Sequence, residues 1–168
     1  MNELENKALL PAGLRDILPP EAGHEAGIRE TLVSTFVGHG YDRVKPPLVE
    51  FEDGLTSGAG AAVSADTFRL MDPVSQRMMG VRADMTTQVA RIAASRLGDV
   101  PRPLRISYTG EVLRTRTTQL RPERQFAQVG AELIGTKSAT ADIEIIQIAV
   151  ESLQKIGVPN LSVDLNIP

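Results

Sequence analysis

GEVLRTRTTQLRPERQFAQVGAELIG, residues 110–135, contains two apolar-patterned arms on either side of an Arg-rich middle. In the second arm Arg124, Gln128 and Glu132 are separated by even intervals. Side chains along a strand point alternately to the two faces of a sheet, so these three share one face. The opposite face is small and mostly apolar, which suits packing against helices. The stretch therefore predicts a hairpin whose polar face either meets water or lines a pocket.

Hydrophobic periodicity and turn residues predict the remaining elements of the chain. Helices are expected over residues 20–37, over residues 87–97, and from a cap at Ser138 or Thr140 to residue 156. Strands are expected over residues 41–45, 67–71, 76–81, 104–113, 124–134 and 161–167, with a loop or weak helix over 54–65. Because short connections join neighbouring strands, antiparallel pairing is favoured. The predicted fold class is α+β, an antiparallel sheet flanked by helices on one face.

Periodic apolar residues in the first and last helices predict which helix faces enter the core. The expected inward residues are Ile28, Leu32, Val33, Phe36 and Val37 in the first helix, and Ile143, Ile146, Val150 and Leu153 in the last. Residues 1–10 lack a strong pattern and are expected to form a flexible arm. Residues 11–168 are long enough for one domain with its own core.

The composition of the chain excludes several classes of site. There is no Cys and there are only two His, so disulfides, thiolate metal sites and Cys nucleophiles are excluded, and a His-based zinc site is not expected. No apolar run approaches the length of a membrane span, and the N-terminus lacks the order of a signal peptide. We therefore expect a cytoplasmic protein with no metal and no cofactor.

Arginine is concentrated in one part of an acidic chain, whose formal net charge is −3. Six arginines lie between residues 102 and 124, where only two glutamates accompany them. Arginine suits the recognition of planar anions such as carboxylates and phosphates. Arg116, Arg121 and Arg124 are therefore candidate anion-binding residues. A solvated, salt-bridged surface is the other interpretation of the same cluster.

Four segments, taken in chain order, resemble the class II aminoacyl-tRNA synthetase fold in its histidyl form. They are Pro11–Pro19, Gly40–Glu50, Val81–Thr86 and the opening hairpin. The second is similar to motif 1, a dimer-interface helix and strand that ends in a proline, here Pro47. The third resembles the family's histidine-binding turn, and the hairpin resembles motif 2, which binds ATP phosphate and amino acid. The resemblance covers about residues 10–165.

The resemblance also implies which residues line a histidine-like pocket. They are Asp84, Thr86, Arg114, Gln128 and Glu132, with Asp84 in place of the family's usual Glu. Structural roles remain open for some of these residues, because Asp84 and Thr86 also suit a helix cap. Pro47 likewise also suits the end of a strand. Arg121, which precedes a proline, also suits a solvated loop.

Three departures from the family pattern bear on activity. Arg116 replaces the glutamate that holds adenine, and Ala127 replaces a histidine. Motif 3, the second histidine-recognition segment and the RNA-binding C-terminal domain are absent from the chain, which therefore resembles only the N-terminal part of the core. The resemblance then implies no catalytic residue here, since a guanidinium cannot accept the adenine hydrogen bond.

This pattern is similar to the branch of the family that serves as regulatory subunits of ATP phosphoribosyltransferase in histidine biosynthesis. The resemblance implies a short-form ATP phosphoribosyltransferase catalytic subunit as partner, which the regulatory subunit activates. It also implies a homodimer and histidine as effector, without a role for tRNA or membrane. Two alternatives remain open. One is a fragment of an active histidyl-tRNA synthetase, and the other is a dimerisation scaffold with a dead pocket.

Overall fold

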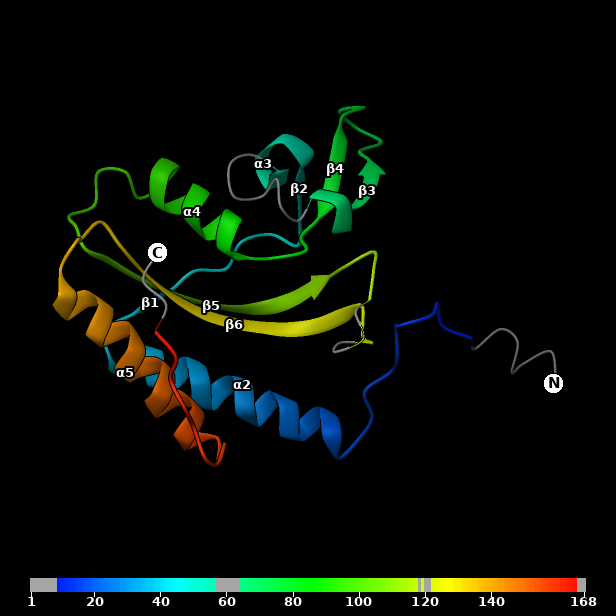
Figure 1. Ribbon diagram of the computed structural model, residues 1–168. Helices are drawn as coiled ribbons and strands as arrows, with labels where there is room; N and C mark the ends of the chain where they lie inside the picture. Colours follow the sequence, from blue (N-terminus) through cyan, green and yellow to red (C-terminus); the bar gives the residue numbers. More distant parts are fainter. Residues whose placement is uncertain (1–8, 57–63, 118, 120–121, 166–168) are drawn as a thin grey trace.

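A computed structural model describes residues 9–56, 64–117, 119 and 122–165, and the long hairpin forms its centre (Figure 1). β5 (Leu104–Leu113) and β6 (Gln125–Ile134) pair antiparallel along their whole length, which confirms both predicted strands. β1 (Asp42–Arg43) pairs with β5 in parallel, so the sheet order is β1-β5-β6. The predicted antiparallel pairing is wrong at this edge, because the long crossover between β1 and β5 returns the chain in the same direction.

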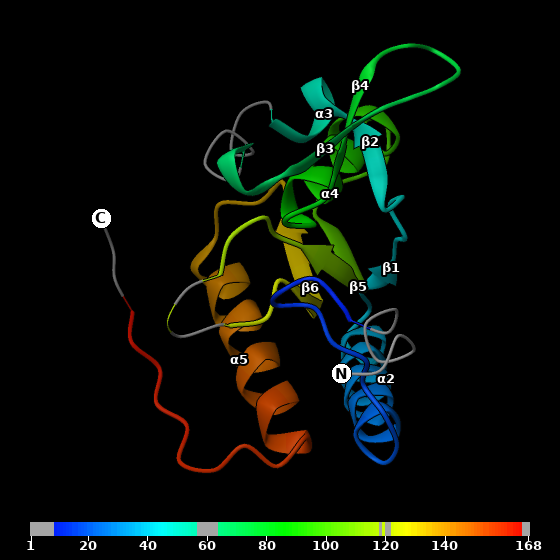
Figure 2. The ribbon, with the colours of Figure 1, turned by 90° about the vertical axis from the view of Figure 1, so that its right-hand side faces the viewer.

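A second, smaller sheet projects away from the first (Figures 1 and 2). β3 (Phe68–Met71) and β4 (Met78–Val81) form the predicted hairpin. β2 (Val49–Phe51) adds to β4 and was not predicted, because three residues are too few to show an alternating pattern. α3 (Glu52–Thr56) follows β2 directly, and residues 57–63 of the predicted loop lie outside the described residues.

Helices cover both faces of the larger sheet, not one face as predicted. α2 (Glu21–Gly38) and α5 (Ala139–Lys155) lie on one face, and α4 (Thr86–Ser95) lies across the other (Figure 1). The reason is that the sheet is apolar on both sides. The α4 side and the α2–α5 side each bury a separate apolar cluster, and a sheet buried on both faces needs two helix layers.

The two clusters form the core. On the α4 side the buried residues are Met85, Val89, Ala93, Leu104, Ile106, Tyr108 and Val112. On the other side they are Phe36, Tyr41 and Ile148, with Val129, Ala131 and Ile145 packed against them. Each strand therefore contributes alternate residues to alternate layers, as the period of two requires.

The last helix begins as predicted but buries a different face. Ser138 caps α5 by accepting the N–H of Ala141 on Oγ at 3.3 Å. The predicted stripe is wrong at its two ends, since Ile143 is 52% exposed and Leu153 is also exposed, whereas Ile148 and Ser152 are buried. The two middle residues of the stripe, Ile146 and Val150, are half-buried. Both stripes have helical spacing, and the position of α2 decides between them. Val37, predicted to be inward in the first helix, is likewise 53% exposed.

The predicted strand at the C-terminus is not present in the described residues. Residues 161–165 pair with no described strand, and Leu165 is 69% exposed. Alternation of apolar and polar residues is not sufficient for a strand, which also needs a neighbour to supply backbone donors and acceptors. Residues 166–168 lie outside the described part.

Gly110 makes close packing possible between β5 and a buried arginine. A Cβ at this position would overlap the Arg82 guanidinium and would lie 3.3 Å from Met85 Sδ. Arg82 is 7% exposed and cannot swing aside, because its Nε donates to the Glu111 carbonyl at 2.7 Å.

We expect Gly110→Ala to lower the free energy of unfolding by about 1–3 kcal/mol, because the added methyl group overpacks a fixed site. Chemical denaturation measures this difference. Gly27→Ala is the matched control, since nothing lies within 4 Å of a Cβ there. It lies in α2 and should stabilise the helix by up to ~1 kcal/mol. Equal stability of the two variants would contradict the packing argument.

Candidate functional site

The turn between β4 and α4 lies over the polar face of β6. Asp84 within the turn and Gln128 on β6 both accept hydrogen bonds from its backbone. The Asp84 carboxylate accepts the N–H of Thr86 at 2.7 Å and the side-chain amide of Gln128 at 3.2 Å. The side-chain oxygen of Gln128, Oε1, accepts the N–H of Met85 at 2.9 Å. Asp84 and Gln128 therefore hold each other and fix the backbone at the start of α4.

Tyr108 connects the turn to Glu132. Its hydroxyl donates to Glu132 Oε1 at 3.1 Å and lies 3.1 Å from Thr86 Oγ1. Tyr108 pairs with Gly130 across the hairpin, and a Cβ at Gly130 would overlap the phenol ring. Glycine at this position lets the ring lie across β6, so the hydroxyl reaches Glu132 two residues further along.

The sequence analysis missed Tyr108 as a site residue. Alternation along residues 104–113 puts its side chain on one side of the strand with Leu104 and Ile106, and all three are buried in the cluster on the α4 side. Pairing of a large aromatic with Gly130 was the available signal, but it required the register of the hairpin.

Burial controls the charge of this site. It raises the pKa of Glu132 above its ordinary value, and the nearby negative charge of Asp84 raises it further, against the lowering effect of hydrogen bonds from Tyr108 and Thr86. Burial also raises the pKa of Tyr108 to about 12, so its hydroxyl keeps its proton at neutral pH. A half-buried carboxylate of this kind gains from a cationic ligand.

A cavity of about 390 Å³ lies beside Glu132 and Thr86. The other lining residues are Ala90, Ala93, Ala94, Arg102 and Ile134. The alanines of α4 leave an open space with a mostly apolar wall, and the Glu132 carboxylate lies at one edge of this space. Arg102 is held by the carbonyls of the α4 C-terminal region, where it donates to Leu97 and Val100 at 2.8 and 3.1 Å. The arrangement suits a small molecule with an apolar body and one positive group.

Arg114 reaches the same turn from the opposite side. Its Nε donates to the Ala83 carbonyl at 3.3 Å, and its guanidinium lies 5.3 Å from the centre of the Phe126 ring. The structure therefore brings all five predicted pocket residues to one turn, where they make two different kinds of contact. Thr86 and Glu132 line the cavity, whereas the other three contact the backbone or the side chains of the turn.

Two of the three candidate anion-binding arginines, Arg116 and Arg124, lie in the described part of the chain. Arg116 is exposed, and Arg121 lies outside the described residues. Arg124 donates to the carbonyls of Arg114 and Ala12 at 3.1 and 3.2 Å, and its guanidinium lies 4.7 Å from the centre of the Phe68 ring. These contacts attach the base of the Arg-rich loop to the N-terminal segment.

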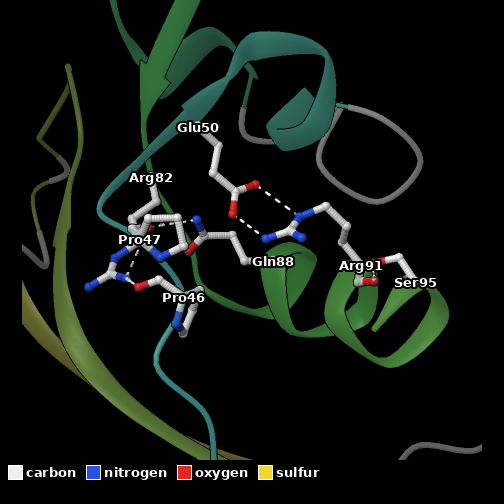
Figure 3. Close-up of polar contacts among 7 residues, drawn as sticks. All are labelled: Pro46, Pro47, Glu50, Arg82, Gln88, Arg91 and Ser95. Atoms are coloured by element: carbon white, nitrogen blue, oxygen red, sulfur yellow. Dashed lines mark hydrogen bonds and ion pairs between the residues drawn. The ribbon is translucent and has the colours of Figure 1, made fainter. Parts of the chain in front are cut away.

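Pro47 presents its ring to solvent and its carbonyl to the protein. The carbonyl accepts the side-chain amide of Gln88 at 2.8 Å and Arg82 Nη1 at 3.4 Å (Figure 3). Its predicted place in a dimer interface stays a prediction.

None of the described helices is both long and apolar enough to cross a membrane. In the same part of the chain, no three His, Cys, Asp or Glu side chains gather as a metal site.

Comparison with known proteins places this architecture in a family. The family described as Histidyl-tRNA synthetase matches residues 13–168. A protein of Paramagnetospirillum magneticum named ATP phosphoribosyltransferase regulatory subunit is 62% identical over 100% of this chain, which spans 44% of that relative. A protein of the same name from Gluconobacter oxydans is 48% identical over 99% of the chain, again 44% of the relative.

Solved structures show the same fold. A Bacillus halodurans protein described as an ATP phosphoribosyltransferase regulatory subunit/histidyl-tRNA synthetase superposes with a TM-score of 0.76 at 30% identity, over 89% of this chain and 38% of its own. The apo histidyl-tRNA synthetase of S. aureus superposes with a TM-score of 0.72 at 23% identity, over 90% of this chain and 35% of its own. The chain therefore spans less than half of the proteins that it matches.

The raised pKa of Glu132 predicts an unusual dependence of stability on pH. The folded protein holds this proton more tightly than the unfolded chain, so stability falls as pH rises from the ordinary Glu value to the raised one. Glu132→Gln should remove that fall, measured as the free energy of unfolding between about pH 4 and pH 7.

Glu144→Gln is the matched control for this experiment. Its hydrogen bond from Arg105 lowers the pKa of Glu144, so its contribution is present above the ordinary Glu value and is lost as pH falls. The two variants should therefore change the pH profile in opposite directions. Profiles that change in the same direction would contradict the assignment of Glu132.

Proposed function

Because this chain belongs to the histidyl-tRNA synthetase family, we propose that it forms part of a regulatory subunit of ATP phosphoribosyltransferase in histidine biosynthesis. The observation that carries the proposal is the 62% identity, over the whole chain, to a protein of that name. The Bacillus halodurans structure described as an ATP phosphoribosyltransferase regulatory subunit/histidyl-tRNA synthetase supports the fold at 30% identity. The chain thus shares the synthetase fold but has the sequence of the regulatory branch.

Arg116 supports a role without adenylation. The family resemblance gives this position to a glutamate that accepts a hydrogen bond from adenine. A guanidinium has donors only, so it offers adenine no acceptor. Arg116 is exposed just after β5. Ala127 in place of histidine removes a further polar group from the same hairpin.

Glu132 supports histidine as the effector of the proposed subunit. Its carboxylate lies at the edge of a cavity of about 390 Å³ with an apolar wall, which suits an imidazole ring that carries a proton or donates an N–H. The Tyr108 hydroxyl donates to this carboxylate from β5 and lies 3.1 Å from Thr86 Oγ1 in the turn. Asp84 and Gln128 keep the turn in place around that ligand.

We also propose that the subunit is a homodimer that binds and activates a short-form catalytic subunit in the cytoplasm. An open groove of about 620 Å³ between α2 and β5 includes Val33, Val37 and Arg43. Val37 is 53% exposed although it belongs to an apolar stripe, so a second copy would bury it. The family resemblance is the ground for also proposing Pro47 as a dimer-interface residue. The proposed subunit does not bind tRNA.

An active histidyl-tRNA synthetase remains the second candidate. The observation in its favour is that Thr86, Arg114, Gln128 and Glu132 are all present around one turn. A robust ATP–pyrophosphate exchange that depends on histidine, measured on the full-length protein, would establish this candidate. A scaffold with a dead pocket predicts neither exchange nor histidine binding.

The decisive experiment combines the full-length protein with a short ATP phosphoribosyltransferase catalytic subunit. We expect the two to co-purify, phosphoribosyltransferase activity to rise in the complex, and histidine to lower it. Glu132→Gln should weaken the response to histidine while the complex still forms, because the variant retains the size of the side chain. A catalytic subunit whose activity is unchanged by the added protein would refute the regulatory proposal.

Thermal denaturation tests the effector separately. Histidine at about 100 times its Kd should stabilise the wild type by about 2.7 kcal/mol, and Glu132→Gln should lose most of this at the same concentration. Glu151→Gln is the control, since Glu151 pairs with His39 and Lys155 at the far ends of α2 and α5. Equal stabilisation of all three proteins would place histidine elsewhere.

A further inference from the structure

Arg82 is a buried cation bonded to backbone carbonyls. Its Nε donates to the Glu111 carbonyl at 2.7 Å, and its Nη1 donates to the Pro46 and Pro47 carbonyls at 3.0 and 3.4 Å (Figure 3). A buried charge is tolerated only when such partners replace water. The positions of these three carbonyls are therefore tied to the position of the guanidinium.

The backbone of Arg82 joins the same segments. Its N–H donates to the Leu48 carbonyl at 3.1 Å, and its carbonyl accepts the N–H of Leu113 at 3.0 Å. One residue thus connects the segment before β2, the end of β5 and the turn that leads into α4. The next four residues along the chain, 83–86, form the turn of the candidate pocket.

α4 is attached to the same segment at two further points. Gln88 donates its side-chain amide to the Pro47 carbonyl at 2.8 Å, and Gln88 is fully buried. Arg91 binds the Glu50 carboxylate through Nε at 3.0 Å and through a second bond from Nη2 (Figure 3). Figure 3 shows these contacts as one row, from Pro46 and Pro47 beside Arg82 to Glu50 opposite Arg91.

We propose that Arg82 is a positioning residue, through which residues 46–48 set the geometry of the pocket turn. If Pro46 and Pro47 shift, the guanidinium must either follow or remain buried without its acceptors. Arg82 follows, and Ala83, Asp84 and Met85 move with it because they continue the same backbone. A displacement of Pro47, an exposed proline 35 residues before Arg82, therefore changes the conformation of the pocket turn.

The inference rests on the proposed function only in one respect, namely that the turn holds a ligand. The second copy that is proposed to contact Pro47 would then alter ligand affinity without touching the ligand. The linkage itself is a property of the described hydrogen bonds and can be measured without any ligand.

Amide hydrogen exchange of Met85 and Thr86 in the full-length protein tests the linkage directly. The Met85 N–H donates to the Gln128 side chain on β6, and the Thr86 N–H donates to Asp84 within the turn. Pro47→Gly loosens the segment but keeps its carbonyl, and Arg82→Met removes the guanidinium. Each should speed exchange at the two amides by about tenfold, as expected for a coupling within the range seen between linked sites. The double variant should exceed Arg82→Met by much less than the tenfold expected of Pro47→Gly alone, because Arg82 carries most of the effect of Pro47 and Gln88 carries the smaller part.

Matched controls separate this linkage from general destabilisation. Pro159→Gly makes the same change at an exposed proline beyond α5, and Ile148→Ala lowers stability from the other core cluster. Neither should speed exchange at Met85 and Thr86 once its global stability is taken into account. Gln88→Met removes one of the contacts to Pro47 and should speed exchange at the two amides about threefold. This variant tests the linkage if Arg82→Met does not fold.

Additive effects of Pro47→Gly and Arg82→Met, or equal effects of the controls, would overturn the inference. Histidine titration of the wild type distinguishes this from failure of the proposed function. If histidine does not bind but the effects of Pro47→Gly and Arg82→Met on exchange are non-additive, histidine is rejected as the effector and the linkage is supported. Histidine binding that is unchanged in Pro47→Gly, Gln88→Met and Arg82→Met, together with unchanged exchange, rejects the linkage and keeps the effector.

Discussion

The register of β5 against β6 is the constraint on which the other features depend. It places Gly130 opposite Tyr108 and Gly110 opposite Gln128, so each glycine leaves room on the α4 side of the sheet. The Tyr108 ring occupies one space and the Arg82 guanidinium occupies the other. A slip of one residue would exchange the two faces of β6 and bury the polar set among helices α2 and α5. The same pairing that builds the core therefore assembles the pocket.

The regular parts of this fold could be predicted from the sequence because their signals are local. β5, β6 and the cap at Ser138 follow from alternation and from hydrogen-bonding groups close in the chain. The inward face of α5 could not be predicted in the same way. Two stripes of the helix are apolar, and α2, more than one hundred residues earlier, decides that Ile148 is the buried one. The partner of β1 and the existence of β2 likewise depend on distant strands.

The candidate site was found through resemblance more than through physical patterns. Even spacing put Gln128 and Glu132 on one face, but only the family motifs connected them with Asp84 and Thr86. The structure adds a distinction that the motifs do not contain, between residues that line the cavity and residues that hold the turn. Arg82 and Tyr108 had no signal of their own, because backbone carbonyls and a glycine across the hairpin are their partners. Arg124 was expected to bind anions, and its donors point to carbonyls of the chain itself.

The parallel pairing of β1 with β5 has a consequence for how the chain folds. The whole smaller sheet and α4 lie between these two strands in the sequence, so their contact closes a long loop and loses much chain entropy. The hairpin of β5 and β6 closes a short one. We therefore expect the hairpin with α5 to form first and β1, with the Pro46–Pro47 segment behind it, to dock late. The segment that Arg82 grips is then among the last to be secured and among the first to be released when the protein opens.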